Sequence, residues 1–431
     1  MKQIKNKISA GVDEVPGKVV KLMGKNIVEE LTTLLNAVAR WGLPRHWRRA
    51  IVRPLHKKGD KSDQRNYRPI SNICALSKLY ERCVLNEIDK VEIDTQGENQ
   101  HGFRVNRGTN TAMLTLQSIL AEKLDSKKLA LVYSIDMSAA FDLLRPELME
   151  KCICDLPTGL QRCILDFLYN RKFVVEINGT RSEEKVLRVG CVQGSVLGPR
   201  LFSIYGRNLE VTLEKLDAQV VTYADDSYVV VSAQNVAELK EKAEMVFRHH
   251  NKFLKEIGMI TNVTKTEATV FSKEPTILNL EVDGSVLQTG LSMNVLGVTF
   301  NHNLKWTDHV DKVMRKASGL LGRLRFMKKK LNKEQTVKVI TSYYFPRVYY
   351  GAETWMNNAS LTSDEWRLLN TSHYKALRIA VGDFKRKWSK QKLNKVCGRA
   401  TPREWSHYTV ANTVASILLN QEPLELFTGL I

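Results

Sequence analysis

Three aspartates stand at positions where the surrounding pattern would favour apolar side chains. Asp136 ends the β-branched and aliphatic run 129–135, and Asp225 and Asp226 lie side by side between two further β-rich runs. A buried carboxylate without a partner is costly, so something positive must compensate these acids. No lysine or arginine lies within several positions of the pair, which makes a divalent cation the better compensator.

Magnesium takes hard oxygen ligands in an octahedron and keeps open positions for water or substrate phosphates. Two such ions about 3.5–4 Å apart, bridged by aspartates from neighbouring strands, lower the pKa of an attacking 3′-hydroxyl and stabilise the leaving pyrophosphate. The three carboxylates therefore predict nucleotidyl transfer with two metal ions. Taken alone, an Asp-Asp pair is also typical of a solvated turn.

The charge balance favours a polyanionic partner. The chain has 65 lysines and arginines against 46 aspartates and glutamates, a net charge of +19. Neutralising phosphates releases condensed counterions, although excess lysine can also serve solubility alone. Placement favours nucleic acid, because the basic residues concentrate at 45–68, 312–333 and 385–403 with aromatic residues interleaved among them.

The length of 431 residues predicts two or three domains. No apolar run approaches the roughly 18 to 20 residues that cross a bilayer, so we expect no membrane association. Seven cysteines, an odd number spread from Cys74 to Cys397, argue against a disulfide framework. We expect an intracellular protein of the nucleus and cytoplasm.

Apolar periodicity supplies the helices that would support the three aspartates. Helices are predicted over 28–41, from after Ser71 to about Val91, over 110–123 and over 236–257. His250 falls in the apolar stripe of the last helix and is interpreted as a packed histidine. From about Trp306 onward the pattern is helical and basic, and residues 356–431 give no functional signal beyond this character and the basic run 385–403.

Strand signals place the aspartates on a central sheet that begins with 129–135. A short strand at 51–55 precedes it, and two hairpins follow, one over 173–178 and 184–189 and one over 220–223 and 228–232. The first hairpin turns at Asn-Gly, and the second carries the aspartate pair at its turn.

The aspartates belong to an ordered series of short motifs. These are Gly11–Pro16, Asn66–Ser71, Gln100–Arg104 with Arg107, Asp136–Asp142, Gly190–Pro199, Tyr223–Asp226, Gly258 through Asn262 to Lys265–Glu267, and Val295–Val298. In order and spacing, over about residues 10 to 300, the series resembles the reverse transcriptase of non-LTR (LINE-type, jockey-like) retrotransposons. Residues 350–355 look like a segment that these elements carry further on.

The resemblance implies an α+β fold, a right-hand polymerase with fingers, a palm of antiparallel sheet backed by helices, and a helical thumb. The fingers would be residues 1–128, the palm 129–300, and the thumb with a C-terminal basic helical region 301–431. Asp136, Asp225 and Asp226 would bind two Mg²⁺ ions, for which Mn²⁺ can substitute. Its expected partners are an RNA template, a DNA primer and dNTPs.

The resemblance also assigns roles to single residues. Lys265 is similar to the lysine that protonates pyrophosphate, and Phe141 is similar to the steric gate against ribonucleotides. Nucleotide binding would fall to Arg68, Lys57, Lys58, Gln193 and Gly194, with Arg68 on the triphosphate and the last two under the templating base pair. Primer and template binding would fall to Leu296, Gly297, Arg104 and Arg107.

Departures from the family pattern keep other functions open. Val192 replaces a usual proline, Gly198 and Gly108 stand where serine is common, and the chain leaves no room for the family's endonuclease, which we expect to be absent from it. The alternative is a non-catalytic RNA-binding module derived from a decayed or co-opted retroelement. An RNA-dependent RNA polymerase is a third option, against which the bulky Phe141 counts.

Overall fold

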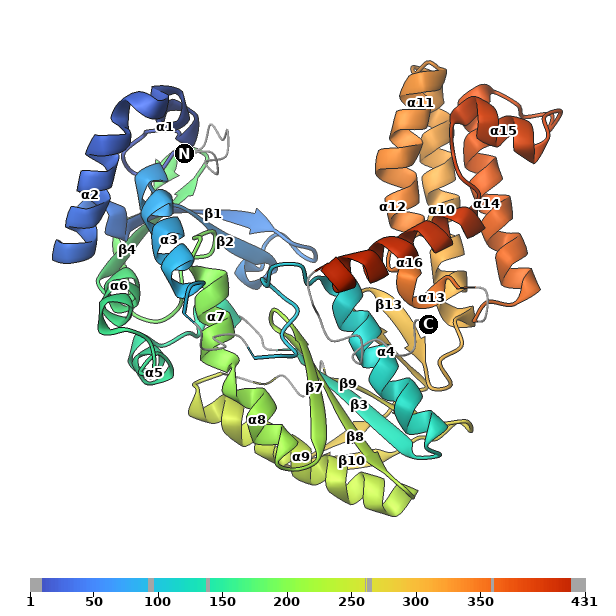
Figure 1. The fold of residues 1–431 in the computed structure, drawn as a ribbon, viewed down its shortest axis with the longest axis horizontal. Helices are drawn as coiled ribbons and strands as arrows, with labels where there is room; N and C mark the ends of the chain where they lie inside the picture. The colour runs from blue at the N-terminus through green and yellow to red at the C-terminus, as the bar shows by residue number, and fades with distance from the viewer. Residues whose placement is uncertain are drawn as a thin grey trace. The chain divides into compact units, whose positions relative to one another are not determined.

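The computed structural model describes residues 10–91, 97–136, 140–259, 261, 266–357 and 360–419 (Figure 1). It mixes helices and sheets, which confirms the predicted α+β class. The chain forms two compact units, each made of three segments: unit 1 combines residues 1–103, 136–215 and 249–262, and unit 2 combines 104–135, 216–248 and 263–431. The predicted boundaries at 128 and 300 stay a prediction.

Unit 1 surrounds a five-stranded sheet. Its strands are β1 (Arg49–His56), β2 (Tyr67–Asn72), β4 (Arg171–Ile177), β5 (Thr180–Arg181) and β6 (Lys185–Leu187). Its helices are α1 (Gly17–Met23), α2 (Val28–Trp41), α3 (Ala75–Ile88), α5 (Pro146–Cys152), α6 (Thr158–Leu168), α7 (Gly198–Gly206) and α8 (Asn208–Glu214). The predicted helices and strands of this region are confirmed, with ends shifted by a few residues.

The sheet of unit 1 corrects one expectation. Its order is β2-β1-β4-β5, with β6 paired to β4, so the hairpin over 173–178 and 184–189 forms but does not join the central sheet. β4 runs parallel to β1, with Ile51 opposite Val174. The reason is burial: Ala50 of β1 lies in a small apolar core with Ile73 and Val192, against which Phe173 of β4 and Leu187 of β6 pack.

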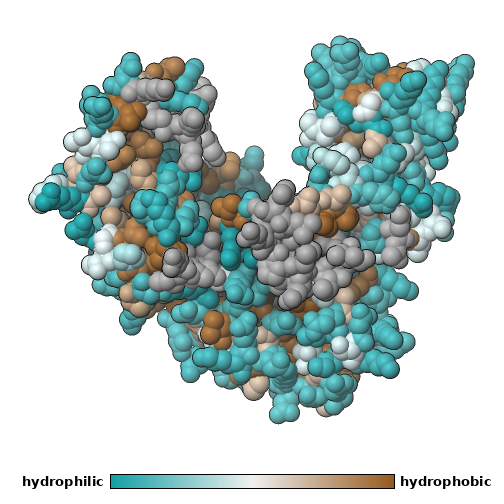
Figure 2. Space-filling model, viewed as in Figure 1, coloured by the Kyte–Doolittle hydropathy of each residue, from teal (hydrophilic) through white to brown (hydrophobic). Residues whose placement is uncertain are grey.

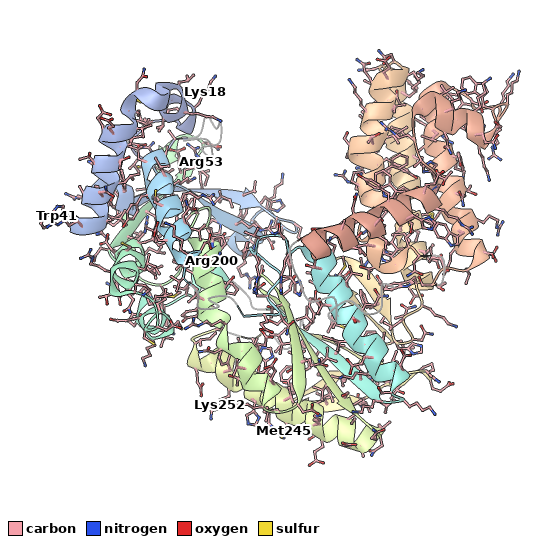
Figure 3. The ribbon with its side chains drawn as sticks, in the orientation of Figure 1. Lys18, Trp41, Arg53, Arg200, Met245 and Lys252 are labelled. Atoms are coloured by element: carbon pink, nitrogen blue, oxygen red, sulfur yellow. The ribbon has the colours of Figure 1, made fainter. Side chains whose placement is uncertain are left out.

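Side chains on the surface of unit 1 include both apolar and basic groups (Figure 3). Trp41 ends α2 with 79% of its surface exposed, and the Arg40 guanidinium lies 5.2 Å from its ring centroid. Arg53 on β1 donates to Glu176 on β4 at 2.8 Å. Such exposed ion pairs contribute little to stability.

Unit 2 contains the predicted central sheet. Its strands are β3 (Leu129–Asp136), β7 (Ala218–Tyr223), β8 (Asp226–Ala233), β9 (Glu267–Phe271), β10 (Asn279–Val282), β11 (Ser285–Gln288), β12 (Ser292–Val295) and β13 (Val298–Asn301). Its helices are α4 (Thr109–Asp125), α10 (Thr307–Lys328), α11 (Lys333–Val339), α12 (Phe345–Val348), α13 (Ala352–Trp355), α14 (Ser363–Val381), α15 (Lys390–Cys397) and α16 (Pro402–Leu419). The helix α9 (Val236–Glu256) begins in unit 2, and its residues from 249 onward are assigned to unit 1.

The four-stranded sheet of unit 2 has the order β7-β8-β3-β9 and is buried on both faces. Because side chains alternate along a strand, Ala130 and Val132 of β3 share a core with α4, whereas Tyr133 packs on Phe247 of α9 at 4.8 Å between ring centroids. Burial on both faces explains the continuous apolar run that ends at Asp136.

The C-terminal helices share one apolar core with this sheet. Leu324, Tyr344, Trp355, Leu369 and Leu377 are all buried in it. Their outer surface is mostly hydrophilic on the face shown in Figure 2. In the described part of the chain, no helix combines the length and the apolar character needed to cross a membrane. The seven cysteines are free thiols.

Candidate active site

The aspartate pair occupies a tight hairpin turn. Tyr223 and Asp226 face each other across β7 and β8, so Ala224 and Asp225 alone form the loop. Ala224 has a φ of +57°, in the left-handed region that alanine rarely adopts. Backbone strain of this kind costs about 1–3 kcal/mol and is concentrated at functional sites. The turn that presents Asp225 therefore depends on an unfavourable backbone conformation at Ala224.

The two carboxylates of the pair differ in surroundings. Asp225 is half-buried, whereas Asp226 is exposed and opens β8. Successive strand residues project to opposite faces, so Asp226 shares a face with Tyr228. Burial, and then the charge of Asp226, raise the pKa of the Tyr228 phenol far above its ordinary value. The two carboxylates of the pair therefore differ both in exposure and in the side chains beside them.

The other two catalytic predictions fall at the edge of what the structure describes. Asp136 is the last residue of β3, which neighbours β8 in the sheet, but its side chain lies outside the described part. Lys265 lies wholly outside it. The donors of the triad are carboxylate oxygens, the hard ligands that suit Mg²⁺, so their chemistry fits the implied metal.

A second turn is hydrogen-bonded to the strand of the aspartate pair. Leu296 and Gly297 connect β12 to β13 with φ values of +48° and +97°. The Leu296 amide donates to the Tyr228 hydroxyl at 3.0 Å, and the Tyr350 hydroxyl donates to the Leu296 carbonyl at 3.0 Å. The structure thus joins the predicted primer-binding turn to β8, two residues beyond Asp226.

The same turn is contacted by the segment 350–355, to which the sequence analysis assigned no role. A Cβ on Gly351, which has a φ of +66°, would lie 2.9 Å from a methyl carbon of Val298. The Trp355 indole donates to the Tyr350 carbonyl at 2.9 Å. Glycine therefore lets this segment approach β13 closely, and Trp355 anchors Tyr350 beneath the turn. Tyr228 and Tyr350 hold the Leu296 turn by hydrogen bonds, a contact that the sequence analysis did not predict.

A basic groove of about 700 Å³ borders this turn in unit 2. Leu296 and Gly297 form one wall, and α10 supplies the cations Lys312, Arg315, Lys316 and Arg323. The buried His309 also lines the groove. Burial and the nearby lysines lower its pKa to about 4, so it is neutral at neutral pH and its Nδ1 accepts from the Thr299 amide at 3.1 Å. The groove carries positive charge without a histidine cation.

We expect Tyr228→Phe to impair primer use more than nucleotide use. The ring would still pack, but the Leu296 amide would lose its 3.0 Å acceptor and the turn would be held by Tyr350 alone. Removing one partner of a buried hydrogen bond costs about 1–3 kcal/mol, so the KM for primer–template should rise about tenfold. Steady-state primer extension checks this, with Tyr344→Phe as the matched control, because the buried Tyr344 hydroxyl is hydrogen-bonded to Ser372 and does not line the groove. An unchanged KM in the Tyr228 variant would separate the turn from primer binding.

In unit 1, the predicted nucleotide-binding residues lie on or near β2. Arg68 is an exposed residue of β2 opposite Leu55 of β1. Lys57 and Lys58 follow β1 and are exposed, and the Lys57 amide donates to the Asn66 carbonyl at 2.8 Å. The three cations therefore occupy the connected ends of one antiparallel pair of strands.

The loop of Gln193 and Gly194 docks on β2 of the same unit. The Ser71 amide donates to the Gln193 carbonyl at 2.8 Å, and a Cβ on Gly194 would lie 3.0 Å from the Ser71 carbonyl oxygen. Gly194 has a φ of +105°, which only glycine adopts readily. The Gln193 side chain donates to Asp142 at 2.8 Å.

Asp142 connects this loop to the predicted steric gate. Burial raises the pKa of its carboxyl, against the hydrogen bond from Gln193 and the charge of Lys57. The neighbouring Phe141 is half-buried, with its ring centroid 4.9 Å from that of Phe202 and 6.0 Å from that of Phe103. Unit 1 thus brings Phe141, Gln193 and Lys57 around one carboxylate, which the sequence had not singled out.

Glu81 is a further residue that the sequence analysis missed. It is fully buried on α3 and accepts from the Val196 and Leu197 amides at 2.5 and 3.2 Å, at the start of α7. Burial raises the pKa of its carboxyl, while the charge of the buried Arg171 opposes that shift. Glu81 therefore anchors the end of the loop that carries Gln193.

Arg104 and Arg107 lie in unit 2, in the segment that leads into α4, and both are half-buried. Their predicted role in template binding stays a prediction, as do the roles of the nucleotide-binding residues of unit 1. Among the described side chains, to which that of Asp136 does not belong, no group of three His, Cys, Asp or Glu residues could hold a metal ion.

The chain is similar in sequence to known proteins. The family model described as reverse transcriptase (RNA-dependent DNA polymerase) matches residues 55–300. The chain is 24% identical over 390 residues to "RNA-directed DNA polymerase from mobile element jockey" of Drosophila melanogaster, covering 87% of this chain and 42% of that protein. It is 25% identical over 392 residues to "Probable RNA-directed DNA polymerase from transposon BS" of the same species, covering 88% and 42%. The chain thus spans about two fifths of the length of these relatives.

Proposed function

Since this chain belongs to the reverse transcriptase (RNA-dependent DNA polymerase) family, we propose that it extends a primer 3′-hydroxyl with dNTPs on an RNA template, as part of a non-LTR retrotransposon protein. The observation that carries the proposal is the hydrogen bond between Tyr228 and Leu296, which links the aspartate hairpin to a turn beside a basic groove. A polymerase needs its catalytic carboxylates and its primer end in one fixed frame.

Each predicted site residue has a defined task in the proposed reaction. Asp136, Asp225 and Asp226 would hold two Mg²⁺ ions, or Mn²⁺, which supply charge stabilisation at the attacking and leaving oxygens. Arg68, aided by Lys57 and Lys58, would grip the triphosphate, since guanidinium suits bidentate phosphate contacts. Lys265 would give a proton to the leaving pyrophosphate.

The remaining residues would position and select. Phe141 would occupy the space of a ribose 2′-hydroxyl, and Gln193 with Gly194 would lie under the templating base pair. Leu296 and Gly297 would steady the primer end, and Arg104 and Arg107 would contact the template backbone. We also propose that the protein works inside the cell, in the nucleus and cytoplasm; its seven free thiols suit a reducing compartment.

Primer extension on a homopolymer RNA template, with the purified chain, tests the proposal. We expect incorporation of the complementary dNTP with Mg²⁺ or Mn²⁺, and its complete loss when a chelator removes the metal. A chain that binds RNA in a salt-dependent manner but incorporates nothing with either metal would contradict the proposal and favour the non-catalytic RNA-binding module.

A further inference from the structure

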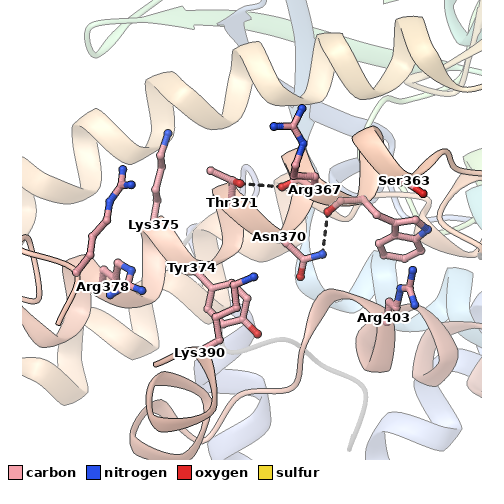
Figure 4. Close-up of a pocket in the computed structure, with 11 residues that line it drawn as sticks. Ser363, Arg367, Asn370, Thr371, Tyr374, Lys375, Arg378, Lys390 and Arg403 are labelled. Atoms are coloured by element: carbon pink, nitrogen blue, oxygen red, sulfur yellow. Dashed lines mark hydrogen bonds between the residues drawn. The ribbon is translucent and has the colours of Figure 1, made fainter. Parts of the chain in front are cut away.

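A second basic cavity lies among the C-terminal helices of unit 2. It has a volume of about 450 Å³ and is formed by α14, α15, α16 and the segment between α14 and α15 (Figure 4). None of its lining residues belongs to the groove beside Leu296 and Gly297. It is therefore separate from the surface assigned above to the primer.

The charge of this cavity is strongly positive. Six cations line it, and no carboxylate does: Arg367, Lys375, Arg378, Arg386, Lys390 and Arg403. Two of these are neutralised by neighbours, Arg367 by Asp364 at 3.0 Å and Arg378 by the buried Asp383. Throughout the described part of the chain, the other four have no ion-pair partner. An anionic ligand would relieve this unbalanced charge.

Two buried aromatic residues form part of the wall, Trp366 at 4% exposed and Tyr374 at 6%. The Arg403 guanidinium lies 5.2 Å from the Trp366 ring centroid, and the Lys390 ammonium lies 5.4 Å from that of Tyr374. Among the described residues the Trp366 indole N–H has no acceptor, although it is buried. Buried donors are normally satisfied, so this one is an exception in the wall of the cavity.

Polar acceptors lie beside the aromatic wall. Asn370 donates its side-chain amide to the Trp366 carbonyl at 2.8 Å, and Thr371 donates its hydroxyl to the Arg367 carbonyl at 2.8 Å (Figure 4). Both bonds use the donor of the side chain and leave oxygen lone pairs as acceptors. The cavity thus combines cations, stacking surfaces and hydrogen-bonding groups.

We propose that this cavity binds a single-stranded segment of RNA outside the polymerase site. Lys375, Arg386 and Lys390 would contact backbone phosphates, and a base would stack on the Arg403 guanidinium, which already lies over Trp366. A duplex keeps its bases paired and stacked, so it cannot present one to a cavity, whereas a single strand can. The inference goes beyond the proposed function and needs no catalysis.

The double variant Lys375→Glu/Lys390→Glu tests the proposal. Both residues are exposed, so their reversal should leave the fold intact, as a thermal melt followed by circular dichroism would check. In fluorescence anisotropy with a labelled single-stranded RNA, we expect the affinity to fall at least about tenfold. The slope of log K against log salt, which is negative, should become shallower by about 1.4, because two phosphate contacts are lost.

The matched control is Lys215→Glu/Lys273→Glu, which makes the same charge change at two exposed lysines that do not line the cavity. We expect this control to bind RNA nearly as the unaltered chain does. An equal loss in the control would overturn the proposal in favour of a net-charge effect, and an equal loss of duplex binding would overturn its single-strand selectivity. Displacement of the RNA by poly-glutamate at matched charge would overturn it in favour of an acidic protein partner.

Catalysis is measured separately so that the two proposals can fail independently. On a short, pre-annealed template–primer with no single-stranded overhang beyond a few nucleotides, the double variant should extend at the rate of the unaltered chain. If the unaltered chain fails to extend any primer, the proposed function fails, while the binding comparison still decides the role of the cavity. A tenfold slower extension of the short substrate by the double variant would place these lysines in the polymerase site and overturn the inference.

Discussion

Asp225→Asn should abolish primer extension on an RNA template while leaving RNA binding nearly unchanged. Asparagine keeps the size and the turn conformation but removes the negative charge that would hold the metal ions. Losing several kcal/mol of metal-borne stabilisation, at a factor of ten for each 1.36 kcal/mol, lowers the rate at least about 10³-fold. Single-turnover extension and RNA anisotropy, measured on the same preparation, check the two parts of this result.

The hairpin supplies its own controls for that experiment. Asp217 precedes β7 at the other end of the same hairpin, with 89% of its side chain exposed and a salt bridge to Lys242 at 2.5 Å. Asp217→Asn should therefore extend normally. Asp226→Asn should be less damaging than Asp225→Asn, because Asp226 is exposed and faces Tyr228. Undiminished extension by the Asp225 variant would rule out the two-metal mechanism at this turn.

Phe141→Val should admit ribonucleotides. The aromatic ring is the bulk that the resemblance places against the sugar, and valine removes most of it. Excluding a hydroxyl by steric contact is worth a few kcal/mol, so the preference for dNTPs over rNTPs should fall about 100-fold. The measurement is the ratio of kcat/KM for a dNTP and its matching rNTP on one template.

A control must distinguish the effect of packing against the Phe141 ring from the steric exclusion of ribonucleotides by that ring. Phe202 lies 4.9 Å from Phe141, centroid to centroid, and is almost fully buried. Phe202→Leu loosens that packing but keeps the Phe141 ring, so it should reduce stability without changing sugar discrimination. Equal loss of discrimination in both variants, or unchanged discrimination in Phe141→Val, would remove Phe141 from the gate role.

Local features of this fold could be predicted from the sequence because they depend on local periodicity. The helix expected over 28–41 is α2 with the same ends, and the hairpin expected to carry the aspartates is β7–β8 with Asp225 in its turn. Apolar spacing and turn chemistry fix such elements without reference to distant residues. His250 is likewise buried, as its place in the stripe of α9 predicted.

Features that depend on distant residues could not be predicted. The hairpin of β4 and β6 joined the sheet of β1 because strand pairing is set by burial across more than 100 residues of chain. The hydroxyl of Tyr228 meets the amide of Leu296, which lies 68 residues away. The cavity draws its cations from α14, α15, α16 and the segment between α14 and α15. The sequence shows the basic run 385–403 but not that it meets the cations of α14.

The interleaving of the two units has a consequence for how the protein is made. The chain passes from one unit to the other five times, after residues 103, 135, 215, 248 and 262. A nascent chain on the ribosome cannot complete unit 1 until residue 262 has emerged. Until β4 is synthesised, the edge of β1 that pairs with it stays unpaired. Truncation before that point should yield aggregation-prone fragments, and chaperone demand during translation should be highest over the first 260 residues.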